Sequence, residues 1–130
     1  MIKFLRLSVA KQGSPTKNYK IKAIRLPGYD GDFGIMAHRA PIMGIMEAGI
    51  IHLTDLNDKK YVYATTGGFY EMLYNKLTII FDTLFYPEDI PDEIKNGKIK
   101  IYNKDISEMS FEQKQEYVLI KLKQEVDALS

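Results

Sequence analysis

Cysteine and tryptophan are absent from this chain of 130 residues. Without cysteine the chain has no disulfide framework, no thiolate metal site and no cysteine nucleophile. No apolar run approaches the roughly 20 residues that a membrane-spanning helix needs, so we expect no membrane insertion. The N-terminal residues, Met1 to Arg6, lack the long apolar segment and the cleavage site of a signal peptide. A cytoplasmic protein is therefore the default expectation.

Catalytic motifs are also missing. The sequence contains no phosphate-binding P-loop, no nucleophile elbow and no zinc-protease motif. His38 and His52 could in principle gather a metal ion together with Asp55 and Asp58, and the alternative is that both histidines are loop or surface residues. We expect no catalytic residue, no cofactor site and no metal site.

The formal net charge of +1 conceals an asymmetry between the two parts of the chain. Residues 1–85 carry 11 basic and 7 acidic residues, whereas residues 86–130 carry 7 basic and 10 acidic residues. Opposite charges favour docking of the C-terminal part on the N-terminal part, although a surface ion pair contributes only about 0–1 kcal/mol. Neither part is basic enough to indicate nucleic-acid binding.

Eight of the nine glycines lie before residue 70. The first 85 residues form short runs that alternate with period 2 or are rich in β-branched and aromatic residues, and turn residues bound each run. Many short strands at close spacing predict a β-sandwich or a flattened barrel. The expected strands are Lys3–Ala10, Tyr19–Leu26, Phe33–Met36, Ile50–Thr54, Lys60–Thr66, Phe69–Leu73 and Leu77–Asp82, with hairpin tips at Asn57-Asp58 and Tyr74-Asn75.

The composition changes near Pro87, where charge density rises and glycine almost vanishes. Ser110 and Gln113 form a capping-box pattern, and the helix formers after them predict a helix over 110–129. Its expected apolar face contains Phe111, Val118, Leu122, Val126 and Leu129. Residues 87–106 are ambiguous, because Pro91 and Gly97 oppose a long helix and the run 98–102 alternates like a strand. We therefore expect a β domain over 1–86 and a helical segment over 87–130 whose first helix is shortened or lost.

Five blocks of residues occur in a characteristic order. They are Pro27-Gly28-Tyr29-Asp30-Gly31-Asp32-Phe33-Gly34, Arg39-Ala40-Pro41, Ala48-Gly49, Gly67-Gly68-Phe69-Tyr70-Glu71, and Leu77-Thr78-Ile79-Ile80-Phe81-Asp82. Each block alone is a weak signal, because Gly and Pro punctuate every β protein. In this order and spacing, over roughly residues 3–86, the chain resembles the epsilon subunit of the rotary F-type ATP synthase, which is called delta in mitochondria.

The resemblance implies a sandwich of about ten strands and a non-catalytic rotor role that couples ATP synthesis or hydrolysis to ion transport. The implied partners are the gamma subunit and the ring of c subunits, and a contact of the C-terminal helix with the catalytic beta subunits stays open. The implied location is the cytoplasmic face of the bacterial inner membrane, as a peripheral subunit. The implied c-ring contacts are Tyr29, Asp30, Gly31, Asp32, Phe33, Arg39, Pro41 and Met43, and Pro27, Gly28, Gly34, Gly67 and Gly68 are expected to be turn residues.

One position remains open, and one motif departs from the family. Met43 can belong to the core or to an interface, because the run 40–46 is too apolar to be fully solvated. Some family members bind ATP at a motif that reads here as Ile90-Pro91-Asp92-Glu93-Ile94-Lys95. That motif has lost its arginine, and a phosphate would have no partner there, so we expect no ATP binding.

Two other classes of function compete with this interpretation. A stand-alone β-sandwich module that binds a small ligand or acts as an adaptor would need a cleft lined with aromatic residues. Tyr61, Tyr63, Phe69 and Tyr70 could line such a cleft, although they could equally pack within a sheet. The other competitor, a small enzyme built on His38 or His52, lacks both a nucleophile and a metal motif.

Overall fold

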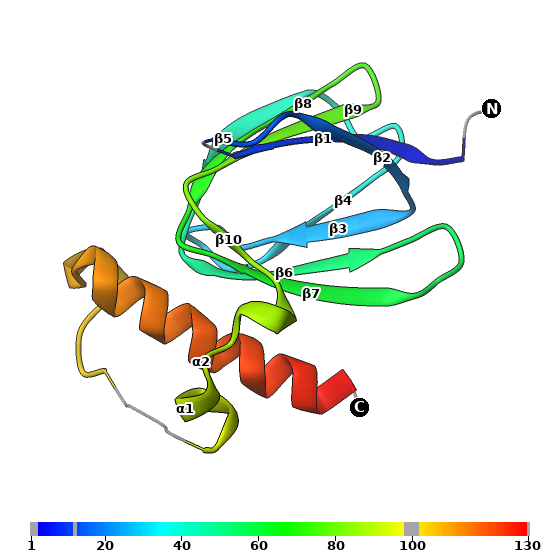
Figure 1. Ribbon diagram of the computed structural model, residues 1–130. Coiled ribbons are helices and arrows are strands. Elements are labelled where there is room, and N and C mark those ends of the chain that lie inside the picture. The colour runs from blue at the N-terminus through cyan, green and yellow to red at the C-terminus, as the bar shows by residue number, and fades with distance from the viewer. Residues whose placement is uncertain (1–2, 12, 98–101, 130) are drawn as a thin grey trace.

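The computed structural model describes residues 3–11, 13–97 and 102–129 (Figure 1). Ten strands form two five-stranded sheets that pack face to face, and a helix lies outside them. Sheet A contains, in order, β2 (Lys17–Ile21), β1 (Leu5–Lys11), β9 (Lys76–Phe81), β8 (Gly68–Leu73) and β5 (Ile42–Met46). Sheet B contains β10 (Leu84–Phe85), β7 (Lys60–Thr65), β6 (Gly49–Thr54), β3 (Ala23–Leu26) and β4 (Phe33–Met36). The expected fold class, mainly β with a C-terminal helix, is confirmed.

Strand alternation decides which side chains fill the space between the sheets. The described ladders are antiparallel except for β1 and β9, which run parallel. The core between the sheets includes Leu5, Leu7, Leu77 and Ile79 of sheet A and Leu26, Ile35 and Ile51 of sheet B. A shift of one residue would turn each strand's core residues outward, so the apolar pattern fixes the register.

One expected strand is divided in the structure, and two further strands were not expected. The expected strand Tyr19–Leu26 is two strands, because the chain crosses from sheet A to sheet B at Lys22. Residues 42–46, which were not among the expected strands, form the edge strand β5, and β10 was not expected either. Gly34 and Gly68, expected as turn residues, lie in β4 and β8. A Cβ on Gly68 would lie 2.3 Å from the carbonyl oxygen of Ile80, so this glycine permits a close approach of strands.

Both expected hairpin tips are confirmed. Tyr74 and Asn75 have positive φ angles of 51° and 57°, which is the backbone of a two-residue type I′ turn between β8 and β9. In the β6–β7 turn, Asp58 has a φ of 64°. The Asp55 carboxylate accepts hydrogen bonds there from the N–H groups of Asn57 (2.8 Å) and Lys59 (2.9 Å).

The C-terminal segment contains two short 3₁₀ turns, η1 (Pro87–Asp89) and η2 (Ile106–Glu108), and two helices, α1 (Asp92–Lys95) and α2 (Phe111–Leu129). Pro91 is the N-cap of α1, and Gly97, with a φ of 100°, follows its end, so these two residues confine α1 to one turn. The alternating residues 98–101 lie outside the described residues. At the start of α2, the Gln113 N–H donates to the Ser110 hydroxyl (3.2 Å), and the Ser110 N–H donates to the Gln113 side chain (2.9 Å).

Helix α2 packs on the outer face of sheet B, over β6 and β7 (Figure 1). Val118 and Leu122 are fully buried there in one cluster with Ile50, Val62 and Ala64. Phe111 and Leu129, expected on the same apolar face, are about half exposed, because they lie at the two ends of the helix. Neither described α-helix combines the length and the apolar character that a bilayer crossing requires. Helix α2 thus covers the outer face of sheet B over β6 and β7, whereas none of the described helices packs on the outer face of sheet A.

Candidate functional site

The uncovered outer face of sheet A carries an apolar patch made of Met43, Ile45, Phe69 and Ile80. Their exposed fractions are 61%, 63%, 40% and 51%. Ile45 of β5 lies opposite Phe69 of β8, which lies opposite Ile80 of β9, so three of the four side chains form one row across the sheet. Clustered apolar side chains that face solvent on a small protein usually mark an interaction surface.

Only part of this patch could be inferred from the sequence. Met43 was left open between core and interface, and the structure exposes it. Ile80 was not singled out, Ile45 was considered only as part of the apolar run 40–46, and Phe69 was considered as a residue of a ligand cleft or of sheet packing. The available signal was that β5, β8 and β9 have apolar residues at both odd and even positions, which indicates strands with two faces to cover.

A row of three cations lies on the same outer face, nearer to the opposite ends of the strands. Arg6 of β1 pairs in register with Lys20 of β2 on one side and with Lys76 of β9 on the other, and all three are exposed. No carboxylate of the described residues forms an ion pair with this cation row. The Arg6 guanidinium donates to the Tyr74 carbonyl (2.8 Å), and the Lys20 ammonium lies 4.9 Å from the centre of the Phe4 ring. Like charges directly opposite each other destabilise a sheet.

The loop Pro27–Asp32, before β4, presents polar groups at one end of the sandwich. Gly31 has a φ of 107°, and the Glu47 N–H donates to the Pro27 carbonyl (3.1 Å), which ties the loop to the start of β6. Tyr29, Asp30 and Asp32 are exposed. A hydrogen bond with the Glu47 carboxylate, and the charge of that carboxylate, raise the pKa of the Tyr29 phenol.

The residues expected to contact the c ring lie along the β4/β5 edge of the sandwich but do not form one cluster. Tyr29, Asp30, Gly31 and Asp32 share the loop. Phe33 begins β4, and its ring packs 5.0 Å from that of Tyr70, between the sheets. Arg39 and Pro41 are exposed in the turn after β4, at the other end of this strand, roughly 10–13 Å away. Met43 belongs to the apolar patch.

The turn that holds Arg39 is itself anchored. His38 has a φ of 64°, and its N–H donates to the Asn75 side chain (2.9 Å), while the Asn75 amide donates to the Phe4 carbonyl (3.0 Å). The β4–β5 turn, the β8–β9 turn and the N-terminal strand are therefore tied together at this end of the sandwich.

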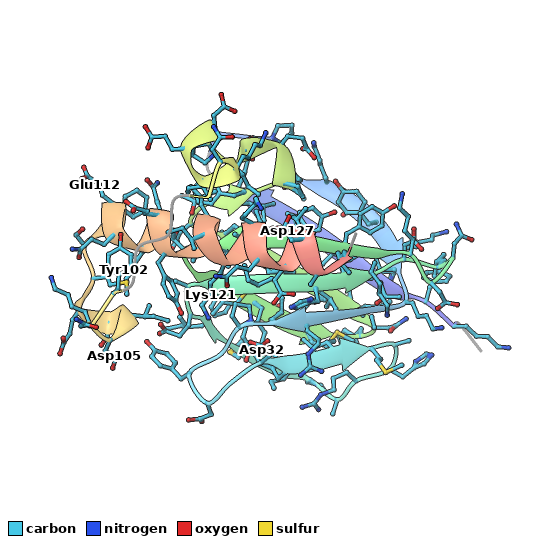
Figure 2. All side chains as sticks on the ribbon, turned by 90° about the horizontal axis from the view of Figure 1, so that it is seen from below. Asp32, Tyr102, Asp105, Glu112, Lys121 and Asp127 are labelled. Carbon is cyan, nitrogen blue, oxygen red and sulfur yellow. The ribbon has the colours of Figure 1, made fainter. Side chains whose placement is uncertain are left out.

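The loop Pro27–Asp32 also borders the C-terminal segment. A cleft of about 440 Å³ separates them, and it is lined by Tyr29, Asp32 and Glu47 on the sandwich side and by Asp105, Tyr117 and Lys121 on the helix side. Figure 2 shows Lys121 on the side of α2 that faces the strand edge where Asp32 lies. The loop and the docked helix are thus neighbours in space, although about 90 residues separate them in the sequence.

The residues of the competing interpretations are dispersed. His38 lies in the β4–β5 turn and His52 on β6. Among the residues that the structure describes, no group of three or more metal-ligating side chains gathers. Of the four aromatic residues proposed for a ligand cleft, Tyr61 and Tyr63 line one cleft, Phe69 faces outward, and Tyr70 is buried.

The stretch that would carry an ATP-binding motif has an apolar structural role. Ile90 and Ile94 are buried in the cluster that holds α2 on sheet B. Both side chains are apolar and pack within this cluster, so they present no charge to a phosphate. The expectation that this chain does not bind ATP stays a prediction.

Comparison with known proteins places these features in a family. Residues 5–86 match the family described as ATP synthase, Delta/Epsilon chain, beta-sandwich domain. The ATP synthase epsilon chain of Desulfitobacterium hafniense is 39% identical over 75 residues, which are 58% of this chain and 55% of that protein. That of Parvibaculum lavamentivorans is 27% identical over 103 residues, 79% of this chain and 78% of that protein. The matched part is thus little more than half of the D. hafniense protein, whereas it is most of the P. lavamentivorans protein.

Solved structures give the same fold. A chain of the Euglena gracilis mitochondrial ATP synthase, in a structure of OSCP, F1 and c-ring, superposes with a TM-score of 0.68 at 17% identity, covering 99% of this chain and 82% of that one. A chain of the Tetrahymena thermophila central stalk and c-ring structure gives 0.60 at 12% identity, covering 93% and 94%. The match over 5–86, which is more than half of the sequence, shows that this chain belongs to the delta/epsilon family of ATP synthase subunits.

Proposed function

We propose that this chain is a non-catalytic rotor subunit in the central stalk of an F-type ATP synthase. In this role it links the gamma subunit to the c ring and helps to couple ATP synthesis or hydrolysis to proton or sodium transport. The observation that carries the proposal is the uncovered outer face of sheet A, with its apolar patch and its cation row. Membership in the family supports it, and the complex would hold the chain at the cytoplasmic face of the bacterial inner membrane.

The outer face of sheet A is the surface that we assign to the gamma subunit. Full burial of an apolar side chain of this size contributes roughly 1.5–3 kcal/mol, and the four patch residues can therefore supply the apolar centre of an interface. The cation row lies beside that centre on the same face and would form a charged rim. Because α2 occupies the opposite side of the sandwich, this surface stays accessible while the helix is docked.

The loop Pro27–Asp32 is the surface that we assign to the c ring. It offers two exposed carboxylates and the exposed phenol of Tyr29 at one end of the sandwich. Such groups fit the polar loops of the c ring better than they fit an apolar surface. Charge pairs at the rim of an interface determine the orientation and the association rate of the partners more than their affinity. Arg39 and Pro41, at the other end of β4, would contact the ring only if the sandwich lies with its whole β4/β5 edge on it.

A binding experiment tests the assignment to gamma. We expect the purified chain to bind its gamma subunit at micromolar concentration in isothermal titration calorimetry, and Ile45→Asp to weaken binding at least tenfold. Leu56→Asp is the matched control, because Leu56 is also about half exposed but lies in the β6–β7 turn. Equal effects of the two substitutions, or no binding by the unmodified chain, would contradict the assignment.

A further inference from the structure

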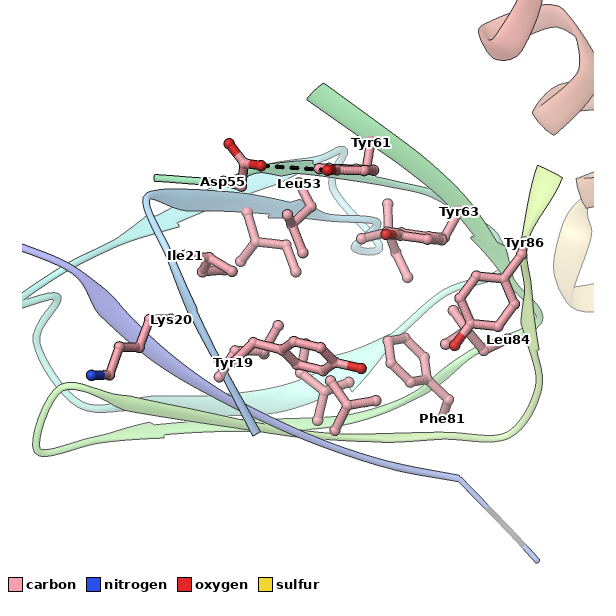
Figure 3. A pocket seen from close by; sticks show the side chains of 15 residues that line it. Tyr19, Lys20, Ile21, Leu53, Asp55, Tyr61, Tyr63, Phe81, Leu84 and Tyr86 are labelled. Carbon is pink, nitrogen blue, oxygen red and sulfur yellow. Dashed lines mark hydrogen bonds between the residues drawn. The ribbon is translucent and has the colours of Figure 1, made fainter. Parts of the chain in front are cut away.

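The sandwich is open along the side where edge strands β2 and β10 face each other. On the other side, the chain passes directly from β4 to β5, and the Phe33 and Tyr70 rings pack between the sheets. On the open side a cleft of about 310 Å³ enters the space between the sheets (Figure 3). It shares Lys20, at its mouth, with the cation row, whereas its interior is separate from the apolar patch and from the loop Pro27–Asp32.

The floor of the cleft is aliphatic and its rim is phenolic. The floor is formed by Leu7, Ile21, Ile24, Ile51, Leu53 and Ile79, and the rim by Tyr19, Tyr61, Tyr63 and Tyr86. The register explains this arrangement. Tyr19 lies opposite Leu7 and Tyr63 lies opposite Ile51, so both rings project toward the interior from the strands at the opening. Figure 3 shows these rings projecting into the gap from opposite sheets.

The rim holds its tyrosines in defined positions. The Tyr63 and Tyr86 rings meet edge to face, with centroids 5.4 Å apart, and the Tyr61 hydroxyl donates to Asp55 (3.4 Å). Tyr63 is half buried, and this burial raises the pKa of its phenol, so the hydroxyl stays protonated and can donate a hydrogen bond. Leucine or phenylalanine would fill inward positions as well as tyrosine does, and phenol hydroxyls there add hydrogen-bonding groups around an apolar floor.

Two charged residues line the opening. Lys20 lies on the β2 side and Asp55 on the β6 side. Asp55 is already engaged, because its carboxylate accepts hydrogen bonds from the N–H groups of its own turn. The Lys20 ammonium lies over the Phe4 ring, 4.9 Å from its centre, and Figure 3 shows it pointing away from the interior of the cleft. Neither charge is directed into the cleft, so neither sign of charge is favoured in a ligand. The volume of the cleft limits the size of the ligand. A dry apolar cavity of about 150 Å³ can hold benzene, so twice that volume holds on the order of 12 non-hydrogen atoms.

From this geometry we infer that the cleft is a binding site for a small uncharged amphiphile. The ligand has an apolar ring or short alkyl chain, which lies on the aliphatic floor, and one hydroxyl or carbonyl group, which meets the tyrosine rim. This inference does not rest on the rotor role, and it accounts for Tyr61 and Tyr63, which that role leaves unexplained.

Methyl NMR of the full-length chain tests the inference, with 4-propylphenol as the probe. We expect saturable shifts of the Leu7, Ile21, Ile51 and Ile79 methyl signals, and none at Ile45 and Ile80 on the outer face of sheet A. The anionic analogue 3-(4-hydroxyphenyl)propionate should bind at least fivefold more weakly, because its carboxylate would lose hydration and meet no cation directed into the cleft. Shifts without saturation, or equal shifts on the outer face, would overturn the site, and equal affinity of the two probes would overturn the ligand class.

A filling substitution links binding to the cleft. Leu53→Phe adds volume at the floor and should weaken 4-propylphenol binding at least tenfold without lowering Tm by more than a few degrees. Ile80→Phe is the matched control, because it enlarges a side chain on the outer face of sheet A. Val9→Phe, also directed into the cleft, replaces Leu53→Phe if that variant does not fold. Unchanged affinity in a folded filled variant would contradict the inference.

Discussion

The hydroxyl of Tyr70 lies beside Gly44, where it leaves no room for a side chain on β5. A Cβ built on Gly44 would lie 2.6 Å from the Tyr70 hydroxyl oxygen and 3.0 Å from the ring carbon that bears it. Gly44 and Tyr70 are opposite each other in the β5–β8 ladder. This contact lets β5 pair closely with β8 and keeps its neighbours Met43 and Ile45 on the outer face.

Gly44→Ala should therefore lower the free energy of unfolding by about 1–3 kcal/mol, through overpacking against Tyr70. Tyr70→Phe removes the nearest oxygen, so the double variant should recover part of the loss. Urea unfolding of the two single variants and the double variant measures this coupling. If Gly44→Ala is neutral, or if its cost is the same with Phe at position 70, the contact is not what requires glycine.

Much of this fold could be predicted from sequence where local chemistry decides the structure. The Tyr74-Asn75 turn followed from Asn75, a residue type that tolerates positive φ, and the start of α2 followed from Ser110 and Gln113. Strand β5 was missed because Gly44 resembles a turn residue unless the position of Tyr70 is known. The crossing at Lys22 was missed because two short strands on different sheets read as one continuous run.

The candidate surfaces were less predictable than the fold. The family resemblance singled out residues 29–33 together with Arg39, Pro41 and Met43 as one interface, but β4 lies between Asp32 and Arg39 and holds them at opposite ends of the strand. The apolar patch arises only when three strands that are distant in sequence align Ile45, Phe69 and Ile80. Periodicity cannot reveal it, because these strands are apolar on both faces and the sequence does not say which face α2 covers.

A charge reversal in the cation row should have opposite effects on the stability of the chain and on its binding to gamma. Lys76→Glu places an acid opposite Arg6, and this should leave the free energy of unfolding unchanged or raise it by up to about 1 kcal/mol. The same change should weaken gamma binding severalfold and reduce its salt dependence. Lys17→Glu on β2, outside the row, is the control. A loss of stability, or equal binding by both variants, would remove the row from the proposed interface.

The packing of α2 on sheet B predicts that the C-terminal tail, residues 107–130, has a structural role. Leu122→Asp buries a charge under α2 and should lower the free energy of unfolding by roughly 1–3 kcal/mol, whereas Gln124→Asp on the exposed side should have little effect. Deletion of residues 107–130 should leave the sandwich folded and relieve little inhibition of ATP hydrolysis. Circular dichroism and ATPase assays of the assembled enzyme check both parts. A severalfold rise in hydrolysis after the deletion would show that the tail is an inhibitor.

Charge reversals at the two ends of β4 should each affect the coupling of ATP hydrolysis to ion pumping. Asp32→Lys and Arg39→Glu should each weaken proton or sodium pumping driven by ATP hydrolysis while the fold stays intact, because each reverses a charge at the rim of the proposed ring contact. Reconstituted vesicles provide the measurement, with Asp30→Asn as a milder change in the same loop. Unchanged pumping for a variant would exclude its residue from the contact.

The ion pair of Lys22 with Asp58 predicts a specific pH response in the β6–β7 turn. The hydrogen bond and the charge of Lys22 hold the pKa of Asp58 below its ordinary value. The stabilisation is therefore present above the ordinary aspartate pKa and is lost as the pH falls through the lowered value. Lys22→Met should raise the pKa of Asp58 in an NMR titration, and Lys60→Met should raise it less. Equal shifts would contradict the assignment.

A pull-down from detergent-solubilised membranes of the source cells tests the rotor role most directly, with the tagged full-length chain as bait. The account predicts that gamma and c subunits are recovered with the unmodified chain and with Leu56→Asp, and that Ile45→Asp loses them. Recovery of the chain without gamma, or equal recovery by Ile45→Asp, would contradict the claim that the outer face of sheet A joins this protein to the central stalk.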